Sequence, residues 1–380
     1  MVATIEPFYA VELSKLAHKL AAEGRSIIHM EFGQPATGAP AAAIAAAHRI
    51  LDNDGMGYWE SAALKQRISG LYADRYAVSV DPERVILTCG ASPALVLALS
   101  CLFEPGDRIA FARPGYVAYR NTAKSLYLDP VELECGPAQR FQLTEAALRA
   151  LDPQPSGLII ASPANPTGTI IAPEEAEAIA AHCRRHGIAI ISDEIYHGLA
   201  YGSRARSMLE FAPDALVINS FSKYFSMAGW RLGWLIVPDH LITPARARMG
   251  NLFLTPPSLA QHAALAAFDC SDELDAHLAT YARNRDLLLK ALPELGLNRI
   301  APPDGAFYAY VDISDFTDDS VAFCTQMLLD TGVATAPGVD FDPVDGRHHM
   351  RFSFALSTAE VDEALARIRP WFAMRAITAG

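Results

Sequence analysis

The chain has 380 residues, of which 31 are basic and 43 are acidic, so its formal net charge is −12. This acidic balance argues against nucleic-acid binding, because proteins that read nucleic acids carry a basic surface. Hydrophobic residues make up 51% of the chain, which excludes a disordered protein. Because single domains mostly span about 50–250 residues, this length predicts two folding units, or one large unit with an appendage.

The sequence shows no export signal, membrane span or metal motif. Its first residues lack a basic stretch followed by a long apolar one, and the uncharged segments 85–103 and 249–268 are broken by polar residues and proline. The six cysteines form neither a CxxC pair nor a closely spaced Cys/His quartet. We therefore expect a soluble, cytoplasmic protein with no bound metal, no nucleic-acid partner and no membrane partner.

The middle of the chain alternates short β-branched runs with amphipathic stretches. This alternation is typical of a mostly parallel sheet with helices on both faces. Helices are expected over 93–103 and 173–186, the second with Pro173 in its first turn. The runs that predict strands are 85–88, 108–111, 158–161, 188–192, 216–219 and 232–237.

The pattern changes near residue 272. A long helix is expected from Asp272 to about Ala291, ended by Pro293. Beyond it the sequence predicts strands over 307–313 and 349–354 and helices near 320–329 and from 358 onward. This change indicates a smaller α+β domain formed by residues 1–39 and 276–380, beside a large domain formed by residues 40–275.

Four segments at or just after predicted strand ends carry the polar residues that suggest chemistry. They are CGAS (89–92), SPANPTG (162–168), SDEIY (192–196) and SFSKYFSMAGWRLGW (220–234). Ligands bind at the carboxyl ends of strands in open α/β sheets. The GxGxxG, GxxxxGK[ST], GxSxG and HExxH motifs are absent, so the common nucleotide-binding, hydrolase and metalloprotease sites are not indicated.

Lys223 is the first candidate for catalysis, because the chain has only six lysines. In an apolar, aromatic setting near another cation, a lysine has a lowered pKa and can form a Schiff base with an aldehyde. Ser220, Ser222 and Arg231 could hold a phosphate beside it. A Schiff-base lysine next to a phosphate site describes pyridoxal 5′-phosphate. On this short segment alone, a solvated surface lysine would fit as well.

The other segments supply matching groups. A strand-to-helix turn formed by Gly90, Ala91 and Ser92 offers free N–H groups to a phosphate, although an ordinary helix cap would look the same. Asp193 could pair with a protonated pyridine nitrogen, whereas Glu194 would point the opposite way in a strand. Asn165 and Tyr196 could donate hydrogen bonds to a phenolate oxygen.

On these segments the sequence resembles the class I/II aminotransferase family of fold-type I pyridoxal-phosphate enzymes, over nearly its whole length. The resemblance implies an α/β fold with a mostly parallel seven-stranded sheet flanked by helices, plus a smaller α+β domain. It further implies that Lys223 forms the aldimine, Asp193 pairs with the pyridine nitrogen, and Asn165 and Tyr196 contact the ring hydroxyl. The implied phosphate ligands are the amides of Gly90, Ala91 and Ser92 together with Ser220, Ser222 and Arg231.

The same resemblance assigns the residues around the substrate. Tyr116 would stack on the pyridine face, and Arg351 would grip the substrate carboxylate as a bidentate fork, with Asn165 also at the substrate. Gly33 matches the N-terminal glycine loop that closes over substrate. Tyr58 matches a tyrosine lent to the phosphate across a homodimer interface, but the turn after it, Tyr58–Leu64, is shorter than the family pattern.

The implied activity is transamination between an amino acid and a 2-oxo acid in two half-reactions. A β-eliminating lyase could use the same lysine on the same fold, and so could a non-catalytic pyridoxal-phosphate sensor. The sensor function would need a basic helix-turn-helix module, which the N-terminus lacks. The sequence leaves open whether the preferred amino acid is acidic, aromatic or aliphatic.

Overall fold

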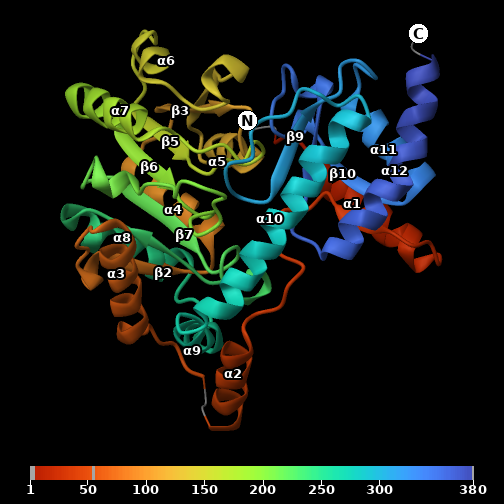
Figure 1. The fold of residues 1–380 in the computed structure, drawn as a ribbon. Helices are drawn as coiled ribbons and strands as arrows, with labels where there is room; N and C mark the ends of the chain where they lie inside the picture. Colours follow the sequence, from red (N-terminus) through yellow and green to blue (C-terminus); the bar gives the residue numbers. More distant parts are fainter. Residues whose placement is uncertain (1–4, 54–55, 379–380) are drawn as a thin grey trace.

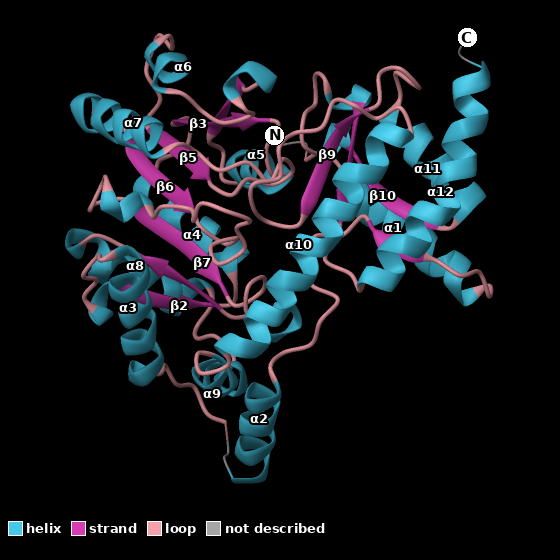
Figure 2. Ribbon diagram, in the orientation of Figure 1, coloured by secondary structure: helices cyan, strands magenta, loops and turns pink. Residues whose placement is uncertain are grey.

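The computed structural model describes residues 5–53 and 56–378, and their strands form two separate sheets (Figure 2). The larger sheet has seven strands in the order β2-β8-β7-β6-β5-β3-β4, and the smaller has four in the order β1-β10-β11-β9. This arrangement confirms the predicted α/β class with a smaller mixed unit. The exact domain boundaries stay a prediction.

The larger sheet is mostly parallel. Only β8 runs antiparallel to its neighbours β2 and β7. Every residue of β2, β7 and β8 is buried, which is the pattern of strands covered on both faces. The strands are β2 (Val85–Thr88), β3 (Arg108–Arg113), β4 (Asp129–Glu134), β5 (Gly157–Ala161), β6 (Ala189–Asp193), β7 (Leu216–Ser220) and β8 (Gly233–Ile236).

Two hydrophobic clusters hold helices to the two faces of this sheet. Leu87 belongs to the cluster that contains Ile179 of α7, and its neighbour Ile86 belongs to the cluster that contains Leu99 of α4. Successive strand residues point to opposite faces, so one β-branched run serves both layers. The helices are α2 (Ala41–Asn53), α3 (Ala62–Tyr76), α4 (Ala91–Leu102), α5 (Val117–Ser125), α6 (Glu145–Arg149), α7 (Pro173–His186), α8 (Ile242–Leu252) and α9 (Ser258–Ala267).

The smaller sheet joins the two ends of the chain. Its strands are β1 (Ile28–Met30), β9 (Tyr308–Asp312), β10 (Val333–Pro337) and β11 (His349–Ser353), with helices α1 (Tyr9–Ala22), α11 (Ser320–Thr331) and α12 (Thr358–Thr378). Because β1 pairs in parallel with β10, the N-terminal segment is built into the C-terminal unit. The long helix α10 (Ser271–Glu294) runs between the two units (Figure 1).

Several boundaries differ from the sequence prediction. Helix α10 continues through Pro293, which lies in its last turn. Proline has no N–H, so the helix loses one hydrogen bond there. The helix ends with the Leu295 N–H donating to the Leu292 carbonyl. Helix α4 starts at Ala91, two residues early, with Gly90 as its N-cap. Strands β1, β4 and β10 were not predicted. No helix within 5–53 or 56–378 is long and apolar enough to cross a membrane.

Candidate active site

A cavity of about 370 Å³ lies at the carboxyl ends of the large sheet's parallel strands, where the smaller unit meets them. It is lined from the large sheet by Asp193 at the end of β6 and by Lys223 just after β7, and from the small sheet by Tyr308 and Arg351. The cavity thus brings together the predicted residues Gly33, Ala91, Ser92, Tyr116, Asn165, Asp193, Tyr196, Ser222, Lys223, Arg231 and Arg351.

The amino group of Lys223 points into this cavity and donates a hydrogen bond to the backbone carbonyl of Gly33. Burial, followed by the positive charges of Arg351 and Arg231, lowers the pKa of Lys223 to about 8, although Asp193 acts in the opposite direction. A substantial fraction of the amine is therefore neutral near physiological pH. A neutral amine can attack an aldehyde and can accept a proton.

Asp193 is held by groups on two sides. Its Oδ2 accepts a hydrogen bond from the Tyr119 hydroxyl at 2.6 Å, and its Oδ1 accepts one from the backbone N–H of Ile195 at 3.1 Å. Burial raises the pKa of Asp193 above the usual range, partly offset by these hydrogen bonds. Each oxygen keeps a free lone pair, so the carboxylate can still accept a bond from a cationic ring nitrogen.

The neighbouring Glu194 lies on the other side of the strand end, as predicted. Its Oε1 accepts hydrogen bonds from the Ser207 hydroxyl at 2.8 Å and the Met208 backbone N–H at 3.0 Å. Burial raises the pKa of Glu194 to about 7. Among the cavity-lining residues Asp193 is the only carboxylate. Glu194 points away from the cavity and binds the end of β6 to the segment around Ser207.

The first turn of α4 and the side chains of Ser222 and Arg231 form one end of the cavity. Gly90 has a φ of 101°, and a Cβ there would lie 2.5 Å from Arg231 Nη2, so the turn requires glycine. Arg231 is fixed by donating to the carbonyls of Ala228 at 2.8 Å and Cys89 at 3.3 Å. Free N–H groups, a hydroxyl and a guanidinium together suit a phosphate.

Three predicted residues lie outside the cavity lining: Gly90, Ser220 and Tyr58. Gly90 is the N-cap of α4 and shapes the turn without lining the cavity. The Ser220 hydroxyl donates to Ser222 at 2.8 Å and contacts the Leu232 carbonyl at 3.0 Å, so it stabilises the turn that carries Ser222. The side chain of Tyr58 is 83% exposed beside Trp59, in a separate depression of the surface.

Arg351 occupies the side of the cavity formed by the small sheet. It donates from Nη1 to Asn165 Oδ1 at 2.7 Å and from Nη2 to the Glu31 carbonyl at 2.6 Å. Its Nε is buried and has no hydrogen-bond partner among the described residues. The guanidinium is therefore fixed in position and retains donors for a carboxylate.

Gly33 contributes its backbone to the wall of the cavity, and Tyr116 contributes its ring. A Cβ at position 33 would lie 1.7 Å from the Tyr308 hydroxyl, so only glycine allows this approach. The Tyr116 ring lies at the start of α5 and packs perpendicular to Tyr119, with 5.6 Å between ring centroids. Both residues line the cavity.

Tyr119 and Tyr308 are among the cavity residues that were not predicted from the sequence. Tyr119 holds Asp193, and the Tyr308 hydroxyl lies 2.6 Å from the Tyr196 hydroxyl. Tyr119 follows Tyr116 by three residues, and in a helix this spacing places both on one face, a signal that could have identified it. Tyr308 approaches from the other sheet, so no local pattern marks it.

A lysine at the carboxyl edge of a mostly parallel sheet, beside a helix N-terminus and opposite a buried carboxylate, is suited to forming a Schiff base with a phosphorylated aldehyde. The family description "Aminotransferase class I and II" matches residues 25–368. The valine–pyruvate aminotransferase of Mycobacterium tuberculosis is 44% identical over 97% of both chains. The aspartate/prephenate aminotransferase of Thermus thermophilus is 31% identical over 96% of both.

Solved structures agree with these sequence relatives. An aminotransferase from Mycobacterium tuberculosis superposes with a TM-score of 0.95 at 44% identity, covering 97% of each chain. An aspartate aminotransferase from Thermus thermophilus, crystallised with maleate, gives 0.90 at 31% identity and covers 96% of this chain and 97% of that one. This chain belongs to the class I and II aminotransferase family. It is an aminotransferase, and its family uses pyridoxal 5′-phosphate.

The residues of the cavity fit that cofactor. A cavity of about 370 Å³ is within the range of small-molecule sites, and it is lined by an amine for the aldehyde and an anion for the ring nitrogen. The helix N-terminus and Arg231 lie together at one end, where a phosphate would be neutralised. The buried, unpartnered Nε of Arg351 leaves a cationic donor for the substrate.

Proposed function

We propose that this aminotransferase exchanges an amino group between a neutral, aliphatic amino acid and a small 2-oxo acid such as pyruvate. The observation that carries the proposal is the distribution of charge in the cavity. Its cationic lining residues are Lys223, Arg231 and Arg351. Each is already matched to an aldehyde, a phosphate or an α-carboxylate, so no lining cation is left for a second substrate carboxylate.

The rest of the lining is mostly apolar. Phe8, Phe32, Leu95, Ala118 and Ile195 all contribute surface to the cavity. Burying a carboxylate against such surface without a partner is costly, whereas an aliphatic side chain gains free energy there. The valine–pyruvate aminotransferase that is 44% identical to this chain supports the same substrate class.

We further propose how the residues divide the work. When bound, the cofactor supplies an electron sink for the substrate α-carbon. Lys223 Nζ would hold the aldehyde carbon and, once displaced by substrate, would accept and return the α-proton. Asp193 would keep the ring nitrogen protonated, with Tyr119 fixing the carboxylate. A positioned general base of this kind contributes about 10²–10⁴-fold to the rate.

The remaining residues would orient the reactants. Asn165 Oδ1 accepts from Arg351, which leaves the Asn165 amide hydrogens as donors toward the cofactor ring oxygen, beside the Tyr196 hydroxyl. Arg351 would bind the substrate carboxylate, and Tyr116 would lie against the ring. The amides of Ala91 and Ser92, the Ser222 hydroxyl and Arg231 would hold the phosphate.

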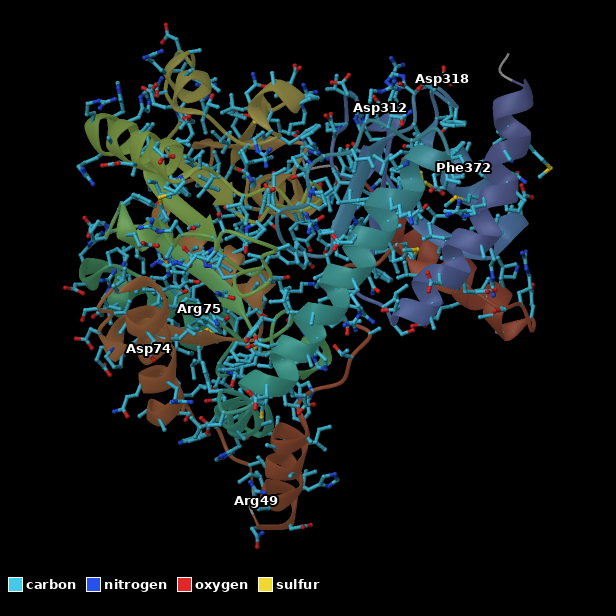
Figure 3. All side chains as sticks on the ribbon, in the orientation of Figure 1. Arg49, Asp74, Arg75, Asp312, Asp318 and Phe372 are labelled. Atoms are coloured by element: carbon cyan, nitrogen blue, oxygen red, sulfur yellow. The ribbon has the colours of Figure 1, made fainter. Side chains whose placement is uncertain are left out.

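We propose a homodimer that shares its active sites. An apolar surface remains uncovered around α2, α3 and α8, where Ile44, Leu51, Tyr58, Trp59 and Leu254 are each at least 40% exposed. Helix α2 projects from the body, and Arg49 near its end lies far from both sheets (Figure 3). A second copy on this surface could receive Tyr58 at its phosphate site. The cytoplasmic location stays a prediction.

The test is a panel of amino donors assayed with pyruvate and with 2-oxoglutarate. We expect valine and similar aliphatic amino acids to be used with higher kcat/KM than aspartate or glutamate. Lys223→Ala should abolish turnover, and Lys290→Ala, which removes an exposed lysine of α10, should leave it unchanged. A preference for dicarboxylic donors would overturn the substrate class, and a monomer in sedimentation would overturn the dimer.

A further inference from the structure

Tyr308, on β9 of the small sheet, contacts three parts of the site at once. Its side chain is 1% exposed and lines the cavity. Its hydroxyl lies 2.6 Å from the Tyr196 hydroxyl, its ring faces the guanidinium of Arg351, and its Oη closes the space above Gly33. No other described side chain of β9 lines the cavity.

We propose that Tyr308 is a positioning residue that donates a hydrogen bond to Tyr196 and supports Arg351 with its ring. The bond would direct the Tyr196 hydrogen toward the cofactor ring oxygen. The ring would hold the substrate-binding guanidinium in place without neutralising it. This inference rests on the proposed roles of Tyr196 and Arg351.

The Tyr196 and Tyr308 hydroxyls share one hydrogen bond. Each phenol has one O–H donor, and the 2.6 Å contact is the only hydrogen bond that either hydroxyl makes among the described residues. One hydrogen therefore lies between the two oxygens, and the other is free. If Tyr308 donates, the free hydrogen belongs to Tyr196.

The surroundings favour Tyr308 as the donor. Burial raises the pKa of both phenols, and the positive charge of Arg351 lowers both. Arg351 lies against the Tyr308 ring, 4.3 Å from its centroid, and the pKa of Tyr308 is raised less than that of Tyr196, so Tyr308 is the stronger acid. A stronger acid is the better hydrogen-bond donor.

Arg351 is surrounded by aromatic rings. Its guanidinium lies between two rings, 4.3 Å from the centroid of Tyr308 and 4.6 Å from that of Phe341. The residue is 2% exposed and forms no ion pair with a described carboxylate. Aromatic faces stabilise a buried cation without supplying a competing anion. The charge of Arg351 thus stays available for a substrate carboxylate.

The chain offers a matched control for the hydroxyl. Tyr310 lies two residues further along β9 and is 2% exposed, but its hydroxyl has no hydrogen-bond partner among the described residues and it does not line the cavity. Tyr308→Phe and Tyr310→Phe therefore remove the same group from the same strand. Only the first removes a hydrogen bond.

The main experiment titrates the absorbance of the bound cofactor with pH in the wild-type holoenzyme and both variants. A weaker Tyr196 bond would stabilise the ionised ring oxygen less, so we expect Tyr308→Phe to raise the transition midpoint by a few tenths of a pH unit. Tyr310→Phe should titrate as the wild type does. Equal midpoints in all three proteins would overturn the hydrogen-bond proposal.

A third variant, Tyr308→Leu, tests the ring. We expect its KM for the amino acid to rise about tenfold, because a desolvated cation–π contact is lost, whereas Tyr308→Phe should keep the wild-type KM. An unchanged KM in a folded Tyr308→Leu protein would overturn the support of Arg351. If the wild-type protein itself bound no cofactor, the proposed function would fail, and that outcome is separate from a failure at Tyr308.

Discussion

Replacing Arg351 with lysine tests the substrate-binding part of the site while keeping the positive charge. The structure fixes the arginine with two hydrogen bonds, to Asn165 and Glu31, and leaves Nε and the second hydrogens of both Nη atoms free. A carboxylate can therefore be bound by two parallel bonds. A lysine has a shorter side chain and a single ammonium group in place of the planar fork, so it would lose one of these two hydrogen bonds.

A hydrogen bond to a charged group is worth about 1.5–3 kcal/mol, which corresponds to a loss of about ten- to 150-fold in kcat/KM. The loss should appear mainly as a higher KM for the amino acid, measured by steady-state assay with valine and pyruvate. Arg347→Lys makes the same exchange at an exposed position four residues away and should have no effect. Equal kcat/KM in the two variants would refute the assignment of Arg351.

Three further changes have defined outcomes. Asp193→Asn keeps the size of the side chain but removes its charge. Because breaking a buried ion pair costs about 3–5 kcal/mol, kcat should fall at least about 10²-fold. A steady-state kcat within threefold of the wild-type value would disprove the pairing of Asp193 with the ring nitrogen. Burial lowers the pKa of Lys223 to about 8. The rate at which the cofactor-free protein takes up the aldehyde, followed by absorbance, should therefore rise as the pH approaches 8 and level off above it. A rate that falls with pH would contradict the neutral amine. Gly33→Ala should lower the free energy of unfolding, measured with denaturant, by about 1–3 kcal/mol, because the new Cβ would overlap Tyr308. Gly38→Ala is the control, since a Cβ there would meet no atom within 4 Å, and it should leave stability unchanged. Equal stability of the two variants would rule out the packing constraint at Gly33.

The sequence predicts the central part of this fold well because the buried strands are β-branched runs that end in polar residues. Asp193 ends β6 and Lys223 follows β7, and parallel strands necessarily present these ends at one edge. Local order in the chain is therefore enough to place both residues in one cavity. The strands that were missed are less regular: β4 contains Pro130 and β10 contains Pro337.

What the sequence could not predict depends on distant packing. Tyr308 meets Tyr196 across 112 positions, and Tyr119 meets Asp193 across 74. Ser220 and Ser222, the two serines just before Lys223, were both predicted to hold the phosphate by their hydroxyl groups. Strand β7 ends at Ser220, however, and in the turn that follows the Ser220 hydroxyl contacts Ser222 and the Leu232 carbonyl.

The central claim is that the amine of Lys223 carries the cofactor. Reduction of the holoenzyme with borohydride, followed by peptide mapping with mass spectrometry, tests it directly. We expect the phosphopyridoxyl group on the peptide that contains Lys223 and on none of the other five lysines. A label on another lysine, or an equally labelled Lys223→Ala protein, would contradict the account.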